Sequence, residues 1–170
     1  IVGFLTDKST IALRMSVELL LEGSVQEFGS EQILDLNFGE YSELDSTDIE
    51  SVEFKVVTEN SSPIGAKLQM YFQDENGNAL DSLFIGAPQP ILQAPSVDAN
   101  GIAIGSKRTE TFVPMDVERF DRVKKKKNIL MRTFFTTADG GLVPVKLLAT
   151  QSAAVRMGLQ QARGDTFAVM

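Results

Sequence analysis

The clearest strand pattern in the sequence lies in residues 51–84, SVEFKVVTENSSPIGAKLQMYFQDENGNALDSLF. Apolar side chains occupy every second position in SVEFKVVT and again in AKLQMYFQ. A period of two places such side chains on one face of an extended strand. The intervening ENSSPIG is rich in turn-forming residues. The pattern therefore predicts two strands whose apolar faces consist of Val52, Phe54, Val56, Ala66, Leu68, Met70 and Phe72.

The end of this stretch, FQDENGNALDSLF, contains Asn76-Gly77. An Asn-Gly pair between alternating runs predicts a β-hairpin in which both residues tolerate a positive φ. Oxygen-bearing side chains also alternate here as calcium ligands do, at Asp74, Asn76, Asn78 and Asp81. Calcium needs about six to eight oxygen ligands, and this segment lacks the glycine-to-glutamate spacing of an EF-hand. We therefore favour a plain hairpin and keep these four residues as candidate metal ligands.

Alternating patterns elsewhere predict further strands. Residues 11–23, IALRMSVELLLEG, match a period of two, although their helical propensity leaves a helix as the alternative. The other predicted strands are ILDLNFG (33–39), RTETFVPM (108–115), ILMRTFFTT (129–137), VPVKLLA (143–149) and AAVRMGL (153–159). Between Ile85 and Gly105, several Pro and Gly residues and a second Asn-Gly pair indicate a short hairpin or an extended crossover loop.

One helix is predicted, in DVERFDRVKKKKN (116–128). Asp116 is a good N-cap, and Val117, Phe120 and Val123 share one face. Lys124 to Lys127 complement the dipole at its C-terminal end. This cluster could meet anionic lipid or a polyanion, but in an acidic chain we interpret it as a solvated helix end.

These elements predict a mainly β fold, an antiparallel β-sandwich of about eight strands with one short helix near residues 116–127. With 43% hydrophobic residues, the 170-residue chain has enough apolar material for one core. No repeat and no long linker divides residues 1–170, so we expect a single domain.

The composition excludes several classes of function. A net charge of -7 argues against nucleic-acid binding, which needs a surplus of Lys and Arg. The absence of His and Cys excludes Ser-His-Asp and Cys-His catalysis and thiolate or imidazole metal sites. With no Trp and only Tyr41 and Tyr71 as tyrosines, a broad aromatic platform for sugars is disfavoured. We therefore expect neither an enzyme nor a bound cofactor.

Two further segments carry residues of chemical interest. The acidic segment holds Glu40, Glu43, Asp45, Asp48 and Glu50, which could collect calcium or supply the paired carboxylates of a glycoside hydrolase. We interpret it as a solvated loop. Arg163-Gly164-Asp165 resembles the integrin-binding tripeptide of adhesive matrix proteins, but three residues recur by chance too often to assign that role.

Three stretches carry a family resemblance: residues 11–23, residues 49–84 and residues 135–160, FTTADGGLVPVKLLATQSAAVRMGLQ. Their apolar and turn pattern resembles the C-terminal β-rich region of secreted or lipid-anchored Bacteroidetes envelope proteins of unknown function, some of them described as adhesin-like. The resemblance implies a β-sandwich module in the cell envelope, in the periplasm or on the outer surface. It carries over no functional residue, and it places any lipid anchor outside this chain.

The chain begins at Ile1 and contains no run of apolar residues long enough to span a membrane, so we expect a fragment of a longer exported protein. We expect a non-catalytic module that binds a protein or glycan at the cell surface, or serves in assembly. Sheet edges and the segment from Ile85 to Gly105 are where a partner would meet it. The alternatives are a carbohydrate-binding module, assisted by calcium, and, less favoured, a carboxylate-dependent glycoside hydrolase.

Overall fold

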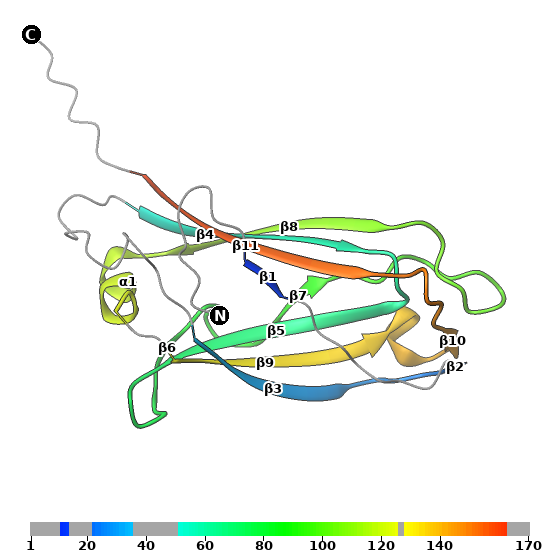
Figure 1. The fold of residues 1–170 in the computed structure, drawn as a ribbon, viewed down its shortest axis with the longest axis horizontal. Helices are drawn as coiled ribbons and strands as arrows, with labels where there is room; N and C mark the ends of the chain where they lie inside the picture. Colours follow the sequence, from blue (N-terminus) through cyan, green and yellow to red (C-terminus); the bar gives the residue numbers. More distant parts are fainter. Residues whose placement is uncertain (1–10, 14–21, 36–50, 126–127, 163–170) are drawn as a thin grey trace, which may run out of the picture.

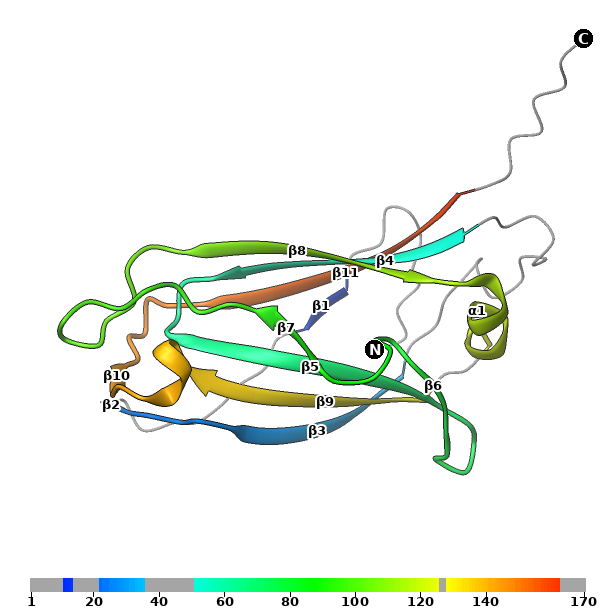
Figure 2. The ribbon, with the colours of Figure 1, turned by 180° about the vertical axis from the view of Figure 1, so that it is seen from behind.

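Two antiparallel sheets lie face to face with a hydrophobic core between them, as the ribbon of the computed structural model shows (Figure 1). The structure describes residues 11–13, 22–35, 51–125 and 128–162. This arrangement confirms the predicted mainly β sandwich with one α-helix. The view from behind shows the same two layers, with the helix at one end (Figure 2).

The first sheet has the strand order β1 (Ile11–Leu13), β11 (Ala153–Ala162), β4 (Ser51–Asn60) and β8 (Lys107–Met115). The second has the order β3 (Phe28–Asp35), β9 (Asn128–Thr137), β5 (Ile64–Gln73) and β6 (Ala79–Ser82), and β7 (Gln89–Leu92) also pairs with β5. A short pair joins β2 (Glu22–Gly23) to β10 (Val145–Lys146). The helical elements are α1 (Val117–Val123) and the 3-10 helix η3 (Ala138–Gly141).

The two strands predicted in residues 51–84, β4 and β5, lie in opposite sheets. Their alternating side chains therefore face each other across the core, where Phe54 and Phe72 are fully buried with ring centroids 6.4 Å apart. Asn60, also buried, holds the crossing between them. Its Nδ2 donates to Ile64 O at 2.7 Å, and its Oδ1 accepts from Ser62 N at 2.9 Å. The turn thus satisfies the polar groups that it buries.

The predicted helix is present but shorter than expected, because it ends at Val123. Asp116 is its N-cap and accepts a hydrogen bond from Arg119 N at 2.8 Å, as predicted. Phe120 and Val123 are fully buried in the core that the two sheets share, and Val117 packs against the same core. The helix therefore closes one end of the sandwich.

The prediction of a strand over residues 143–149 is wrong, because only Val145 and Lys146 pair as a strand. Pro144 has no N–H to donate to a ladder, and of the alternating Val143, Val145 and Leu147 only Val145 is buried. Over residues 33–39, the strand β3 begins earlier, at Phe28, and residues 36–39 lie outside the described residues. Of residues 11–23, both described parts are strands, and residues 14–21 lie outside.

Two neighbouring glycines follow β9 with left-handed backbone angles, Gly140 at φ 69° and Gly141 at φ 75°. A Cβ on Gly140 would meet nothing within 4 Å, whereas a Cβ on Gly141 would collide with Val25 O and lie 2.7 Å from Gln26 Cα. Val25 O cannot easily move, because it accepts a hydrogen bond from Thr137 N at 2.9 Å.

We expect Gly140→Ala to lower the free energy of unfolding by about 1–2 kcal/mol, the cost of the left-handed conformation for a residue with a Cβ. Gly141→Ala should lower it by a further 1–3 kcal/mol or so, because overpacking adds to that cost. Urea unfolding of the two variants checks the difference. Equal losses would mean that the segment around Val25 is free to shift.

Candidate functional site

A cavity of about 330 Å³ lies between the two sheets. The crossing from β4 to β5 and the segments after β9 and β10, which supply part of its lining, lie at the end of the sandwich away from α1 (Figure 1). Its walls come from β5 and β9 on one side, from β4 and β11 on the other, and from β7 and residues 147–152. Sixteen of its 22 lining residues are apolar, and the other six are Ser, Thr or Gln. We call this space the intersheet cavity.

Methionines line the inner end of the intersheet cavity. Met70 and Met131 are direct partners in the pairing of β5 with β9, and Met157 of β11 belongs to the opposite sheet. All three are buried. Unbranched thioether side chains adapt their shape to irregular spaces. This end of the cavity can therefore change its shape when the methionine side chains rotate.

The outer end is polar. Ser61 N donates to Ser152 O at 2.8 Å, and Ala138 N donates to Pro63 O at 2.7 Å. These bonds draw three chain segments together, and they bring five of the six polar lining residues to one end. The five are Ser62, Thr136, Thr137, Gln151 and Ser152. The cavity therefore changes from apolar to polar along its length.

The pattern of apolar residues in the sequence did not predict this cavity. Its lining residues alternate like those of any half-buried strand, so a period of two does not separate them from the filled core. The available signal was side-chain size. Ala66, Thr133 and Ala153 are small residues at positions that face the cavity, whereas the filled half of the core has Phe54 and Phe72. Small residues on facing strands leave space between sheets packed about 10 Å apart.

Three of the candidate metal ligands, Asp74, Asn76 and Asn78, lie in the hairpin turn between β5 and β6. Asp74 Oδ1 accepts from Asn76 N at 2.9 Å and from Asn78 N at 2.8 Å, and its Oδ2 accepts from Asn78 Nδ2 at 3.0 Å. The carboxylate thus organises the turn. The expectation of positive φ at both turn residues is wrong for Asn76, because only Gly77, at φ 82°, has it. The loop is a type I turn followed by a left-handed glycine.

The second Asn-Gly pair forms a turn with the same hydrogen bonds. Asp98 Oδ1 accepts from Asn100 N and Ile102 N, both at 2.9 Å, and Gly101 has φ 78°. Of the two alternatives predicted between Ile85 and Gly105, a short hairpin or an extended crossover loop, the hairpin is present at this turn, closed by the antiparallel bridge of Val97 with Ala103. Both Asp-x-Asn-Gly segments use the Asp carboxylate in place of a backbone acceptor.

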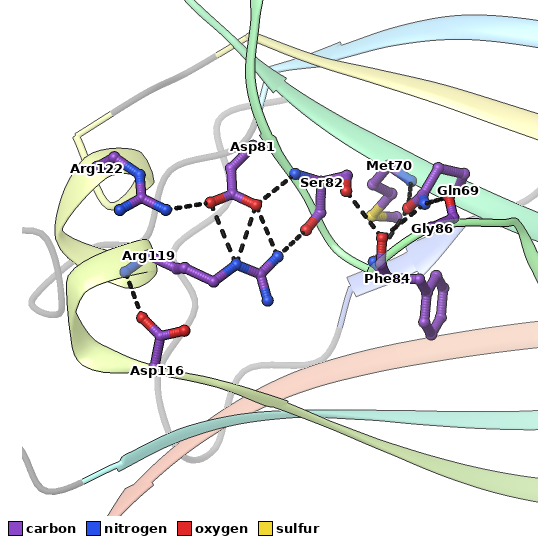
Figure 3. A network of polar contacts seen from close by, with 9 residues as sticks. All are labelled: Gln69, Met70, Asp81, Ser82, Phe84, Gly86, Asp116, Arg119 and Arg122. Atoms are coloured by element: carbon purple, nitrogen blue, oxygen red, sulfur yellow. Dashed lines mark hydrogen bonds and ion pairs between the residues drawn. The ribbon is translucent and has the colours of Figure 1, made fainter.

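The fourth candidate ligand, Asp81 of β6, pairs with the helix instead (Figure 3). Arg119 Nη2 donates to Asp81 Oδ1 at 2.7 Å, and Arg122 Nη2 donates to Asp81 Oδ2 at 2.8 Å. Arg119 Nη2 also donates to Ser82 O at 2.5 Å. In the parts of the chain that the structure describes, no group of three or more acidic side chains is placed to hold a metal ion.

The paired Asp81 should make the stability depend on pH. Burial raises the pKa of Asp81, but hydrogen bonds from Arg119, the Ser82 N–H and Arg122 outweigh it and hold the pKa below its usual range. A carboxyl with a lower pKa in the folded chain stabilises the fold above its unfolded pKa of about 3.9, and this contribution is lost as pH falls through the folded pKa.

We therefore expect the free energy of unfolding of Asp81→Asn to fall less steeply than that of the wild type as pH is lowered from about 5 to about 2. Urea unfolding across this range measures both slopes. Some acid dependence should remain, because hydrogen bonds from the Ile102 N–H and from Lys55 lower the pKa of Asp98 and Glu110, respectively. Identical slopes would show that the Asp81 pairing adds nothing.

The other sequence candidates fall into two groups. Tyr41, the acidic residues 40–50 and Arg163 to Asp165 lie outside the described residues. Tyr71 is half-buried, and the Arg132 guanidinium lies over its ring at 5.2 Å from the centroid. The interpretation of Lys124 to Lys127 as a solvated helix end is wrong for Lys124, which is buried. Its Nζ pairs with Asp121 Oδ1 at 2.6 Å.

No family model and no curated protein matches this sequence. Among solved structures, the chain is similar to a Parabacteroides distasonis protein assigned as secreted, at 15% identity and a TM-score of 0.49 over 80% of this chain and 38% of that one. It is also similar to the structure of infectious bursal disease virus, Gx strain, at 9% identity and a TM-score of 0.39 over 95% and 34%. The chain spans less than two fifths of either protein.

None of the helices among the described residues is long and apolar enough to cross a membrane.

Proposed function

We propose that this chain is a non-catalytic binding module of the cell envelope and that the intersheet cavity is its ligand site. The observation that carries the proposal is the cavity itself. Its volume of about 330 Å³ falls in the range of small-molecule sites, about 300–1,000 Å³, and such sites are mostly apolar with a few polar groups at one place. The intersheet cavity has this composition.

The chemistry of the lining supports binding in preference to catalysis. Among the described lining residues there is no Asp, Glu, Lys or Arg. Thr136 Oγ1 donates to Gln26 O at 2.8 Å, and Thr137 Oγ1 donates to Val25 O at 3.3 Å, so both hydroxyls are tied to backbone oxygens. A general acid or base needs a titratable group near the reacting atom. A cavity with this lining holds a molecule without transferring a proton to it.

The location in the envelope, in the periplasm or on the outer surface, rests on the resemblance of the sequence to secreted and lipid-anchored Bacteroidetes proteins. In that setting, a lipid anchor outside this chain would supply any attachment to the membrane. Adhesin-like contact with a protein or glycan is compatible with the cavity, because the segment from Ile85 to Gly105 carries the exposed Ile85 and Ile104. A partner that contacted only Ile85 and Ile104 would leave free the two lining residues that this segment supplies to the cavity, Ile91 and Leu92.

Xenon tests whether the cavity accepts an apolar guest, because dry apolar cavities bind it. We expect a saturable, protein-induced ¹²⁹Xe chemical shift that Val155→Phe abolishes, since Val155 lines the cavity. Val57→Phe is the matched control. Val57 is also half-buried and lies on the neighbouring strand, but it is not among the lining residues. Ala153→Leu, at the outer end, is a milder second filling variant. A ¹²⁹Xe shift that persists in both filling variants, Val155→Phe and Ala153→Leu, as it does in the control would contradict the proposal.

Thermal melts test carbohydrate and calcium binding. A ligand that binds only the folded state, at a hundredfold over its dissociation constant, adds about 2.7 kcal/mol. A glycan or calcium that raises the midpoint equally in the wild type and in Val155→Phe would favour the carbohydrate-binding module over the cavity. We expect neither to do so, because Arg132 covers the face of Tyr71 and the Asp74 carboxylate accepts three hydrogen bonds within its own turn.

A further inference from the structure

The intersheet cavity is long and narrow. Along the pairing of β5 with β9, it extends from the Met70–Met131 pair to the Ile64–Thr137 pair, six residues further along each strand. At about 3.4 Å per residue this is a length of about 20 Å. The volume of about 330 Å³ is therefore spread along the strands and not gathered in one compact space.

An elongated space of this kind suits one extended hydrocarbon chain. The volume sets its length. A dry cavity of about 150 Å³ holds benzene, so a space slightly more than twice as large takes about a dozen carbon atoms. The eleven or so carbon–carbon bonds of such a chain, of about 1.5 Å each and inclined to the chain axis, span about 14 Å and fit within the cavity.

The polarity of the cavity walls indicates in which orientation a hydrocarbon chain would bind. The inner end is formed by Met70, Met131 and Met157, whose adaptable side chains suit an aliphatic tail. At the outer end, the Ser62 hydroxyl donates to Asn60 Oδ1 at 2.8 Å and Gln151 Oε1 accepts from Leu148 N at 3.0 Å. The Ser62 oxygen can still accept, and the Gln151 NH2 group can still donate, a hydrogen bond to a polar head group. Since no described lining residue is charged, the walls supply no counter-ion and favour an uncharged head group.

We propose that the ligand of the intersheet cavity is a single unbranched acyl or alkyl chain of about twelve carbons, with its tail among the methionines and a small polar head at the Ser62–Gln151 end. This inference rests on the proposed function, and it adds the class of ligand and its orientation. Each methylene that enters the cavity strengthens binding about fourfold, and a methylene beyond its length adds nothing.

Calorimetric titration with straight-chain alcohols of about eight to sixteen carbons tests the length. Affinity should rise about fourfold per methylene up to about twelve carbons and then level off or fall. Cyclododecanol is the matched control for shape, because it has the carbon number of dodecan-1-ol in a wide ring, and it should bind at least about tenfold more weakly. Equal affinities for these two twelve-carbon alcohols, or affinity that rises steadily to sixteen carbons, would overturn the inference.

Two variants of Met157 test the orientation of the bound hydrocarbon chain in the cavity. Met157→Ala deepens the inner end and should move the preferred alcohol to a length about two or three carbons greater. Met115→Ala is the control, since Met115 is equally buried but does not line the cavity, and it should leave the preference unchanged. Met157→Val is the second variant if Met157→Ala does not fold. An unchanged preference in both Met157 variants would overturn the orientation.

Two further ligands show whether the hydrocarbon chain comes from a free fatty acid or from an acyl ester. The xenon experiment then separates failure of this inference from failure of the proposed function. Dodecanoic acid and monododecanoylglycerol represent a free fatty acid and an acyl ester, and binding of either with the twelve-carbon optimum supports the inference. If xenon enters the cavity but no straight-chain compound binds, the inference fails while the proposed function stands. If xenon also fails to enter, both fail.

Discussion

Phe54→Ala is expected to lower the free energy of unfolding by about 3–5 kcal/mol, the usual loss when a buried phenylalanine is truncated. Phe54 is fully buried on β4, and its ring lies 6.4 Å from that of Phe72 on β5. The change therefore opens a void where the two sheets meet. Domains of this kind are stable by about 5–15 kcal/mol in total, so urea unfolding should register the largest single-residue effect proposed for this chain.

Phe112→Ala is the matched control for Phe54→Ala. Phe112 lies on the edge strand β8 with 48% of its surface exposed, and its ring meets the Lys55 ammonium at 5.1 Å from the centroid. Its loss should cost about 1 kcal/mol or less, since exposed cation–π contacts are weak. Similar losses in the two variants would show that the Phe54–Phe72 contact does not join the sheets as the structure indicates.

Arg119→Ala should produce the second large effect, a loss of about 3 kcal/mol, because it breaks a pair that is nearly out of solvent. The side chains of Arg119 and Asp81 are 12% and 10% exposed. Among the described residues, Arg122 and the Ser82 N–H are the donors that the Asp81 carboxylate keeps when Arg119 is removed. The helix α1 would also lose its main polar tie to β6 and to Ser82 O.

Arg122→Ala controls for the charge, because it contacts the same carboxylate from a side chain that is 53% exposed. Exposed ion pairs contribute about 0–1 kcal/mol, so this variant should unfold close to the wild-type urea concentration. The double variant Asp81→Asn with Arg119→Ala should lose less than the sum of the two single losses, since the pair couples them. Additive losses would show that Arg119 acts through packing alone.

The space between the two sheets is filled by side chains in one half of the protein and open at the intersheet cavity in the other. Near α1, aromatic side chains such as Phe54, Phe72 and Phe120 fill the space between the sheets. In the other half, Ala66, Thr133 and Ala153 leave it open. Truncations in the filled half test stability, whereas substitutions along the cavity test binding, so the two sets of variants separate the two properties of the fold.

Local patterns predicted the strands well where their physical basis is local. The alternation in residues 51–58, 66–73, 129–137 and 153–159 corresponds to β4, β5, β9 and β11, because a period of two expresses the geometry of one strand. The N-cap at Asp116 was also predictable, since capping involves only neighbouring residues. The prediction failed at residues 143–149, where Pro144 and a single buried valine leave little to pair.

The sequence alone thus determined the class of the fold, most of its long strands and the helix that closes one end. Only the tertiary structure decided that β4 and β5 face each other from different sheets, that Asp81 pairs with Arg119 across 38 residues of sequence, and where the cavity lies. The physical reason is that periodicity records which side chains point inward. The space between inward side chains depends on which strands meet, and that is decided by packing over the whole chain.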